Sequence, residues 1–482
     1  MSEQVVLDIS VLGDLVPEWS VDLLPTIQKE IAGSKYKIVI LDDDPTGTQT
    51  AKDLPVLTHW SKEALRDELA GRYPAFFILT NSRSLPEPAA CELAREIGTN
   101  LKLASDETGI RTVLISRSDS TLRGHFPAEV NAMAAAMGKG RLPYLILPFF
   151  LEGGRYTIND IHYVQEGERL VPAARTSFAQ DTAFGFHCSN LKDWVEEKSA
   201  GAISAAEVVS VTIDDLRCGG PPRVAEILSD VQPGGACIVN AVSYRDMEVL
   251  VTALLEVENS GKEFLYRTAA SFVRTRTGLD HRTELLSKGE LTSANNHGGL
   301  FVIGSYVNKT SLQVTALLNS TNIKAIEIRV DTLLDPVRNK PEIARVAEEA
   351  SAMLASGRDT AIYTSRQLIT GENATASLAI GQTISDSLID IVHRVTVQPR
   401  YLVAKGGITS SDVATKGLGV HRAMVIGQAL PGVPAWQLGP ETRYPGMSYI
   451  IFPGNVGDDD ALVRIQRTLQ QEALQGGYQD AD

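Results

Sequence analysis

The sequence has little cysteine and no long apolar run. Its 482 residues include four cysteines, Cys91, Cys188, Cys218 and Cys237, and none of them forms a Cys-x-x-Cys pair. This spacing indicates neither a zinc site nor a disulfide framework. No stretch approaches the roughly 20 apolar residues of a membrane span. The N-terminal segment carries acids where a signal peptide needs basic residues. We therefore expect a cytoplasmic protein with no membrane partner.

Basic side chains are fewer than acidic ones. The chain has 45 Lys and Arg residues against 59 Asp and Glu residues, a formal net charge of -14. This charge disfavours general binding to nucleic acid. Hydrophobic residues make up 43% of the chain and charged residues 22%, which is ordinary for a globular protein. The sequence therefore predicts a packed protein whose partners are small molecules.

Short apolar runs alternate with helical stretches along the whole chain. In the first half, "KIVIL", "AFFILT", "TVLIS" and "YLILP" each lead into a polar or Gly-containing turn. The alternation predicts an α/β fold of largely parallel sheets flanked by helices, with ligands at the carboxyl ends of strands. The length favours two domains, with the active site in the cleft between them. We place them at 1–273 and 298–482, joined by a crossover at about 274–297.

The segment "LDDDPTGTQT", residues 41–50, puts three acids at the end of an expected strand. Asp43 and Asp44 could form an Asx turn and cap a helix, but one cap needs only one acid. Two functional interpretations remain open. Asp42, Asp44 and Thr46 match an Asp-x-Asp-x-Thr phosphatase nucleophile signature. Alternatively, the acids hold a polyol and a magnesium ion for phosphoryl transfer.

Guanidinium groups, hydroxyls and a carboxylate follow other expected strands. The segment "SRSDSTLRGH", residues 116–125, could be a capped helix start with a solvated face. The same residue types suit a polyhydroxylated acid, because Arg binds a carboxylate with two hydrogen bonds and Asp and Ser accept or donate to hydroxyls. Candidate substrate-binding residues are Asp43, Arg83, Arg117, Ser118, Asp119, Ser120 and Arg155.

Three Gly-bearing turns follow expected strands in the second half. "KGGITSSD" at 405–412 has the composition of a phosphate loop, since glycines let backbone N–H groups approach an anion at a helix start. "GSYVNKT" at 304–310 and "PGNVGD" at 453–458 are similar strand ends. None of them is a Walker A loop. Together the three turns favour a nucleotide site.

Three segments together resemble the four-carbon acid sugar kinase family. They are Asp-Asp-Pro-Thr-Gly at 43–47, Asp-Ser-Thr-Leu-Arg-Gly at 119–124 and Gly-Gly-Ile-Thr-Ser at 406–410. The resemblance implies an N-terminal acid-sugar domain and a C-terminal ATP domain. By matching positions, the ATP-binding residues would be Ser305, Gly406, Gly407, Ile408, Thr409 and Gly454.

The family resemblance implies transfer of the γ-phosphoryl group of ATP to the terminal hydroxyl of a threonate, erythronate or 3-oxo-tetronate. Mg²⁺ would bridge the phosphates, and Asp44 or Asp119 would be the catalytic base. The sequence leaves a homodimer open. Two alternatives are a phosphatase that uses Asp42 and Asp44, with Lys405 and residues 458–459 as distant partners, and a non-catalytic sugar-acid sensor.

Overall fold

The computed structural model describes residues 5–44, 46–280, 284–305, 307–366, 374–454 and 456–470, and side chains are described from 380 onward in the segment that begins at 374. Pro45, Tyr306 and Asn455, which belong to the segments quoted above, lie outside the described residues. The chain divides into two compact units, Met1–Thr283 and Glu284–Asp482. The division falls inside the segment 274–297.

A parallel sheet forms the centre of the first unit. Its strands are β2 (Tyr36–Asp42), β3 (Leu54–Leu57), β4 (Ala75–Leu79), β5 (Arg111–Arg117), β6 (Tyr144–Leu147), β10 (Val209–Val211), β11 (Ala236–Val239) and β12 (Leu265–Thr268). They follow the order β10-β11-β6-β12-β5-β2-β4-β3, and every neighbouring pair is parallel. The expected parallel α/β sheet is therefore confirmed for this unit.

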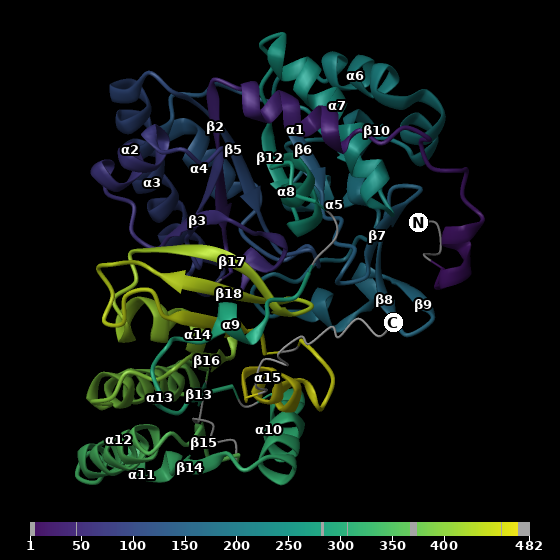
Figure 1. Cartoon of the computed structure of the whole chain (residues 1–482). Coiled ribbons are helices and arrows are strands. Elements are labelled where there is room, and N and C mark those ends of the chain that lie inside the picture. Colours follow the sequence, from purple (N-terminus) through teal and green to yellow (C-terminus); the bar gives the residue numbers. More distant parts are fainter. Residues whose placement is uncertain are drawn as a thin grey trace, which may run out of the picture. The chain divides into compact units, whose positions relative to one another are not determined.

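Helices cover the sheet of the first unit. They are α1 (Leu24–Gly33), α2 (Lys62–Ala70), α3 (Glu87–Thr108), α4 (Ala128–Ala136), α5 (Leu191–Lys198), α6 (Gly220–Asp230), α7 (Tyr244–Asn259) and α8 (Ala270–Arg276). Figure 1 shows α2, α3 and α4 in one group and α1, α6 and α7 in another. Every residue of β4 is buried, which requires cover on both faces of the sheet. Local sequence sets the helix ends: α3 ends at Gly109, whose φ of 69° forms a left-handed cap.

A second, antiparallel sheet in this unit was not expected from the sequence. It has the order β1-β9-β8-β7, with β1 (Leu7–Asp8), β7 (Arg155–Ile158), β8 (Ile161–Glu166) and β9 (Arg169–Pro172). Asn159 and Asp160 join β7 to β8 with φ values of 51° and 66°. Positive φ at both central residues is typical of a tight hairpin turn. The hairpin places Arg155 at the start of β7.

The second unit also has a largely parallel sheet, as expected. Its strands are β13 (Leu300–Ile303), β14 (Lys324–Ile328), β15 (Thr360–Thr364), β16 (Leu402–Lys405), β17 (Arg422–Leu430), β18 (Val433–Leu438) and β19 (Ser448–Phe452). The order is β17-β18-β19-β16-β13-β15-β14. The strands from β19 to β14 are parallel, whereas β17, β18 and β19 pair antiparallel.

Helices flank this sheet as well. They are α9 (Lys288–Leu291), α10 (Asn308–Ser320), α11 (Val330–Leu333), α12 (Asn339–Ala355), α13 (Ala374–Arg394), α14 (Gly407–Asp412) and α15 (Ala461–Gln470). The buried core includes Phe301, Val403, Ile450 and Leu462 from the strands and α15. Within the described ranges, no helix has the length and apolar character needed to cross a bilayer.

Candidate active site

The carboxyl ends of three neighbouring strands bring the predicted substrate residues together. In the sheet register, Asp42 at the end of β2 lies opposite Leu79 of β4 and Arg117 of β5. The residues that follow these strand ends are therefore close in space, although they are far apart in the sequence. A short 3-10 turn, Ser82–Ser84, follows β4 and carries Arg83.

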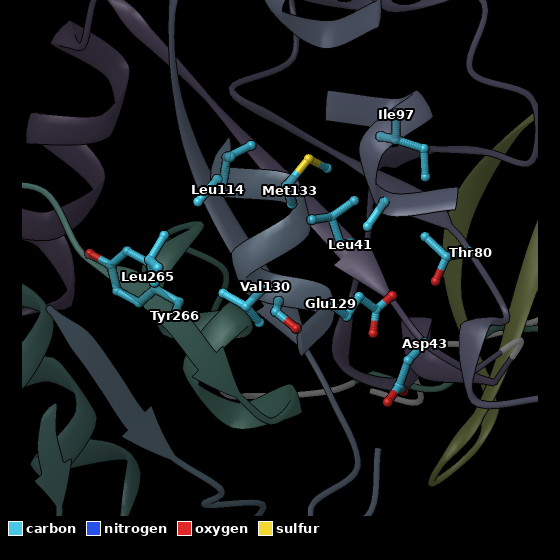
Figure 2. A pocket seen from close by; sticks show the side chains of 13 residues that line it. Leu41, Asp43, Thr80, Ile97, Leu114, Glu129, Val130, Met133, Leu265 and Tyr266 are labelled. Atoms are coloured by element: carbon cyan, nitrogen blue, oxygen red, sulfur yellow. The ribbon is translucent and has the colours of Figure 1, made fainter. Parts of the chain in front are cut away.

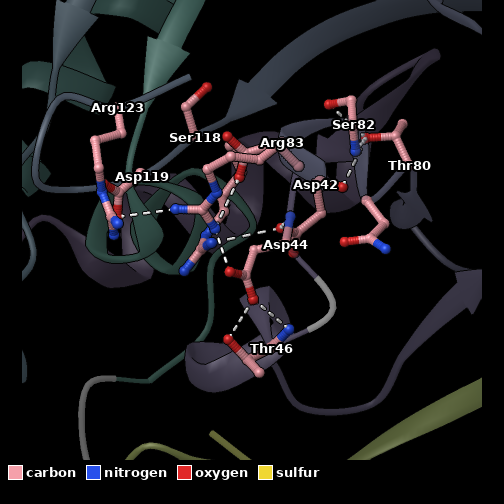
Figure 3. A network of polar contacts seen from close by, with 12 residues as sticks. Asp42, Asp44, Thr46, Thr80, Ser82, Arg83, Ser118, Asp119 and Arg123 are labelled. Carbon is pink, nitrogen blue, oxygen red and sulfur yellow. Dashed lines mark hydrogen bonds and ion pairs between the residues drawn. The ribbon is translucent and has the colours of Figure 1, made fainter. Parts of the chain in front are cut away.

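Arg83 lies among three carboxylates (Figure 3). Its Nη1 is 3.1 Å from Oδ1 of Asp119, and its Nη2 contacts Oδ2 of Asp44 and lies 3.5 Å from Oδ1 of Asp43. The Arg83 side chain is 13% exposed. Four predicted site residues thus form one compact charged cluster. In this state Arg83 neutralises acids of the chain itself.

The three carboxylates have different environments. Burial would raise the pKa of Asp119, but the charges of Arg83 and Arg123 and a hydrogen bond from Thr121 lower it well below its usual range. Burial likewise opposes ionisation of Asp44, but Arg83 and hydrogen bonds from Thr46 lower its pKa. Both side chains are therefore held in the ionised form.

Asp43 has a different environment from its two neighbours in the cluster. Burial raises the pKa of Asp43, and the charges of Arg83 and Arg117 offset this only in part. Its Oδ1 is buried and has no hydrogen-bond partner among the described residues. Among the three carboxylates that contact Arg83, Asp43 has the longest ion pair, at 3.5 Å, and the only raised pKa.

Asp42 lies beneath this cluster and is fully buried. Its Oδ1 accepts hydrogen bonds from Arg117 at 3.4 Å and from the backbone N–H of Asp44 at 3.2 Å. Burial is the main cause that raises the pKa of Asp42 to about 7. Gly47 closes over the carboxylate, because a Cβ at this position would lie 1.7 Å from Oδ2 of Asp42. A group covered in this way cannot act as the attacking nucleophile of a phosphatase.

The remaining predicted substrate residues lie around the cluster. Arg117 is buried against Asp42, and Ser118 Oγ lies 3.0 Å from Ser116 Oγ. The backbone carbonyl of Ser120 accepts a hydrogen bond from His162. Arg155 donates to the carbonyl of Gly153, and its Nε is buried without a partner among the described residues. Burial lowers the pKa of Arg155.

His162 contacts the segment that carries Ser118 to Ser120, and it was not predicted as a site residue. Its Nε2 donates to the Ser120 carbonyl at 2.8 Å, and its Nδ1 accepts from the Thr157 hydroxyl at 2.9 Å. Burial lowers the pKa of His162 to about 3, which keeps the ring neutral. Its hairpin strand pairs with β7 only in the folded chain, so no local pattern indicated this role.

Glu129 is a second residue that the sequence did not single out. It lies on α4 in a pocket lined mainly by apolar side chains, including Ile97, Leu114 and Met133, and Asp43 lies at the same pocket (Figure 2). Burial is the main cause that raises the pKa of Glu129 to about 7, and the negative charge of Asp43 adds to the effect. A single Glu in the first turn of a helix resembles an ordinary surface residue in the sequence.

In the second unit, the three predicted Gly-bearing turns converge. Ile303, Lys405 and Phe452 lie side by side at the ends of β13, β16 and β19. A Cβ on Gly406 would lie 2.9 Å from Cβ of Ser305, and one on Gly454 would lie 3.6 Å from Oγ of Ser305.

The predicted residues of this site have distinct backbone and side-chain positions. Gly406 has φ 115° and is the N-cap of α14, while Gly407 is the first residue of that helix. Thr409 is buried, and its Oγ1 approaches Gly304, where a Cβ would lie 2.4 Å away. The side chain of Ile408 is 64% exposed. These turns leave backbone N–H groups at a helix start, which is a favourable environment for an anion.

Two further residues at these turns were not predicted as ATP-binding. Thr310 donates from Oγ1 to the Gly454 carbonyl at 3.2 Å and contacts Ser305 Oγ at 3.1 Å. Lys405 is fully buried and donates to the Pro453 carbonyl at 2.6 Å. Burial is the main cause that lowers its pKa to about 7. Lys405 directly precedes the two glycines of the predicted phosphate loop, and this position in "KGGITS" could have indicated it as a site residue.

The described residues contain no group of three or more His, Cys, Asp and Glu side chains that could hold a metal by themselves. Mg²⁺ in kinase sites usually takes one or two carboxylates and completes its shell with phosphates and water. Asp44 is the most open carboxylate of the cluster, with 28% of its side chain exposed against 12% for Asp119. A carboxylate of this kind fits such a partial ligand set.

Comparison with known proteins identifies two family models. A sugar-binding N-terminal domain matches residues 38–276, and a nucleotide-binding C-terminal domain matches residues 300–462. A D-threonate kinase from Salmonella typhimurium is 26% identical over 449 residues, 88% of this chain and 96% of that relative. A D-erythronate kinase from Heliobacterium modesticaldum is 26% identical over 324 residues, 65% of this chain and 67% of that relative.

Solved structures share the fold. One from Salmonella typhimurium superposes with a TM-score of 0.66 at 16% identity and covers 90% of this chain and all of its own. One from Haemophilus influenzae has a TM-score of 0.62 at 18% identity and covers 89% of this chain and all of its own.

Proposed function

The chain belongs to the four-carbon acid sugar kinase family, and on that premise we propose that it phosphorylates the terminal hydroxyl of a threonate, erythronate or 3-oxo-tetronate with ATP. It is a carbohydrate kinase, a phosphotransferase with an alcohol group as acceptor. The first unit binds the acid sugar and the second binds ATP in this proposal. The observation that carries it is the cluster of Arg83 with Asp43, Asp44 and Asp119 at the strand ends.

The sugar-acid carboxylate needs a cation that the chain does not already neutralise. Arg83 contacts three carboxylates and Arg117 contacts Asp42. Arg155 has no ion pair among the described residues, and its Nε lacks a hydrogen-bond partner. We therefore assign the substrate carboxylate to Arg155, and assign to Arg83 the task of holding the acids in place. Hydroxyl groups of the sugar would meet Ser118, Ser120 and the cluster.

The attacking hydroxyl needs a base with an available lone pair. The oxygens of Asp119 accept hydrogen bonds from Arg123 and Thr121, and one of them forms an ion pair with Arg83. The oxygens of Asp44 accept hydrogen bonds from Arg83 and Thr46. Asp43 has a raised pKa, and its Oδ1 accepts no hydrogen bond from the described residues and has only the longer ion pair with Arg83, at 3.5 Å. These contacts favour Asp43 as the base over Asp44 and Asp119, the two residues expected from the sequence. Positioning by the other two acids would still contribute to the rate.

In the second unit, the turns at Ser305, Gly406 to Thr409 and Gly454 would bind the phosphates of ATP through backbone N–H groups and hydroxyls. Mg²⁺ bound to the nucleotide would neutralise charge on the phosphates. The protein is expected to act in the cytoplasm, and gel filtration would show whether it forms a homodimer.

A coupled ATPase screen tests the function directly. Purified protein would be mixed with ATP, Mg²⁺ and each stereoisomer of threonate, erythronate and 3-oxo-tetronate. We expect sugar-dependent ADP release with one of these acids and none with the neutral four-carbon alcohol. ADP release with none of the acids would contradict the proposed substrate class.

Two variants separate the proposed base from the phosphatase alternative. Asp43→Asn should lower kcat by about a hundredfold to ten-thousandfold with little change in KM for ATP. Asp42→Asn should keep substantial turnover, because Asp42 is buried beneath Gly47. Phosphate release from sugar phosphates without ATP, abolished by Asp42→Asn, would overturn the kinase assignment. Full activity of Asp43→Asn would remove that residue as the base.

A further inference from the structure

Arg366 lies beside the converging turns of the second unit, yet none of the motifs contains it. It follows β15 by two residues, and β15 is the parallel neighbour of β13, with Tyr363 opposite Ile303. Its Nη2 donates to the backbone carbonyl of Ser305 at 2.8 Å and to Oγ1 of Thr364 at 3.1 Å. The guanidinium is therefore anchored on the turn that follows β13.

The other two nitrogens of this guanidinium have no hydrogen-bond partner in the part of the chain that the structure describes. Nε and Nη1 of Arg366 are buried and donate no hydrogen bond to any described residue. No ion pair joins Arg366 to a carboxylate within the described ranges, and Tyr363 and then Glu327 on β14 raise its pKa only in part. Burial is the main cause that lowers this pKa. A buried donor without an acceptor costs free energy, which an entering anion would recover.

The surroundings favour an anion over a neutral ligand. Ser305, whose carbonyl accepts from Arg366, contacts Thr310 and approaches Gly406 and Gly454. Arg366 is therefore bound to a residue of the three converging turns. Lys405 is buried at the same turns, and the charge of Lys309 acts on it. Basic side chains therefore lie at these turns, and no carboxylate among the described residues forms an ion pair with Arg366 or Lys405.

We propose that Arg366 binds the phosphate chain of the nucleotide, with its free Nε and Nη1 donating to phosphate oxygens. The guanidinium suits this task because its planar group of donors matches phosphate geometry. The inference rests on the proposed function, which places the nucleotide in this unit. It adds a fourth strand end, that of β15, to the three that the sequence indicated.

Calorimetry with the full chain tests the inference through ligands that differ in phosphate content. ATP, ADP, inorganic tripolyphosphate and adenosine would be titrated into wild type, Arg366→Met and Arg366→Lys. We expect Arg366→Met to weaken ATP and tripolyphosphate about tenfold to hundredfold, the usual effect of losing a charged hydrogen bond. Adenosine affinity should stay unchanged. Arg366→Lys keeps the charge without the planar donors and should weaken ATP by a smaller factor.

A control and a salt series separate phosphate binding from a structural role. Arg358 is an exposed arginine before the opposite end of β15, so Arg358→Met is a matched change that should leave ATP affinity unaltered. ATP affinity should fall less steeply with salt in Arg366→Met than in wild type.

Several outcomes would overturn the assignment of Arg366. Equal loss for ATP and adenosine, or an unchanged ATP affinity in Arg366→Met, would do so. If Arg366→Met does not fold, Arg366→Lys decides the question. The assignment would be overturned if Arg366→Lys bound ATP with the same affinity and the same salt dependence as wild type. Failure of wild type to bind ATP or tripolyphosphate would instead overturn the proposed function of the second unit.

Discussion

Nη1 of Arg83 lies 3.1 Å from Oδ1 of Asp119, and this contact joins the ends of β4 and β5 across β2, which lies between them in the sheet. The same guanidinium contacts Asp43 and Asp44, which follow β2. One cation thus links the segments after three strands. The cluster keeps its shape because the attraction acts over short distances in a largely desolvated site.

Removing this cation should damage both folding and catalysis. Arg83→Ala leaves three neighbouring carboxylates without their common partner, so we expect about 3 kcal/mol lower stability and a loss of kcat/KM of at least a hundredfold. Chemical denaturation and steady-state kinetics measure the two effects. Arg95→Ala, at an exposed arginine paired with Glu92 on α3, should change stability by less than about 0.5 kcal/mol. If Arg83→Ala and Arg95→Ala lowered stability equally, Arg83 would not be the residue that holds the three carboxylates together.

The close approach of Gly47 to Asp42 predicts a strong coupling between the two positions. A methyl group at Gly47 would overlap the Asp42 carboxylate, whose Oδ2 would be 1.7 Å away, so Gly47→Ala should be destabilising by several kcal/mol. Asp42→Gly in the Gly47→Ala background should recover part of the loss. A double-mutant cycle by urea denaturation would measure this coupling. Additive effects would show that the cost of Gly47→Ala does not arise from contact with Asp42.

The protonation of Glu129 predicts a pH dependence of stability. Its pKa is raised from 4.5 to about 7 by burial, so between these values the folded chain binds a proton that the unfolded chain releases. The contribution of Glu129 to stability is therefore present below pH 4.5 and is lost as the pH rises through about 7. Gln cannot ionise, so Glu129→Gln should gain about 1–3 kcal/mol over wild type above pH 7 and little at pH 4.5.

Denaturation curves from pH 5 to 8 would measure the Glu129 effect. Glu92→Gln provides a control at an exposed carboxylate, 77% of whose side chain is accessible, and should not change the pH dependence. A Glu129→Gln curve parallel to that of wild type would contradict the prediction.

Gly406 should be more sensitive to substitution than Gly407. Its φ of 115° disfavours any side chain, and a Cβ would meet Ser305 at 2.9 Å. Gly407 begins α14 and is absent from the described glycines with positive φ. We expect Gly406→Ala to weaken ATP binding by at least about tenfold and Gly407→Ala to have the smaller effect. Gly381→Ala on α13, where a Cβ meets open space, is the control. The expectation would be refuted if calorimetry showed a larger loss of ATP affinity in Gly407→Ala than in Gly406→Ala.

The sequence was enough to indicate the strands that precede the polar segments, the largely parallel character of the central sheet in each unit and the place of the polar segments at the strand ends. These features depend on local apolar runs and turn residues, and 43–47, 119–124 and 406–410 already indicated the family. The hairpin β7–β8 and the antiparallel pairing of β17 and β18 were not predicted, because strand partners are chosen by contacts distant along the chain.

The contacts and the burial of each site residue could be read only from the folded chain. Arg83 is a candidate substrate-binding residue in the sequence, and the strand order places it among three acids. Asp42 and Asp44 are equivalent in the sequence, but one is buried beneath Gly47 and the other is partly open. Glu129 and Arg366 belong to no motif. Burial and ion-pair partners arise from segments that meet only on folding, so the pKa of each group and its availability to a ligand are properties of the assembled sheet.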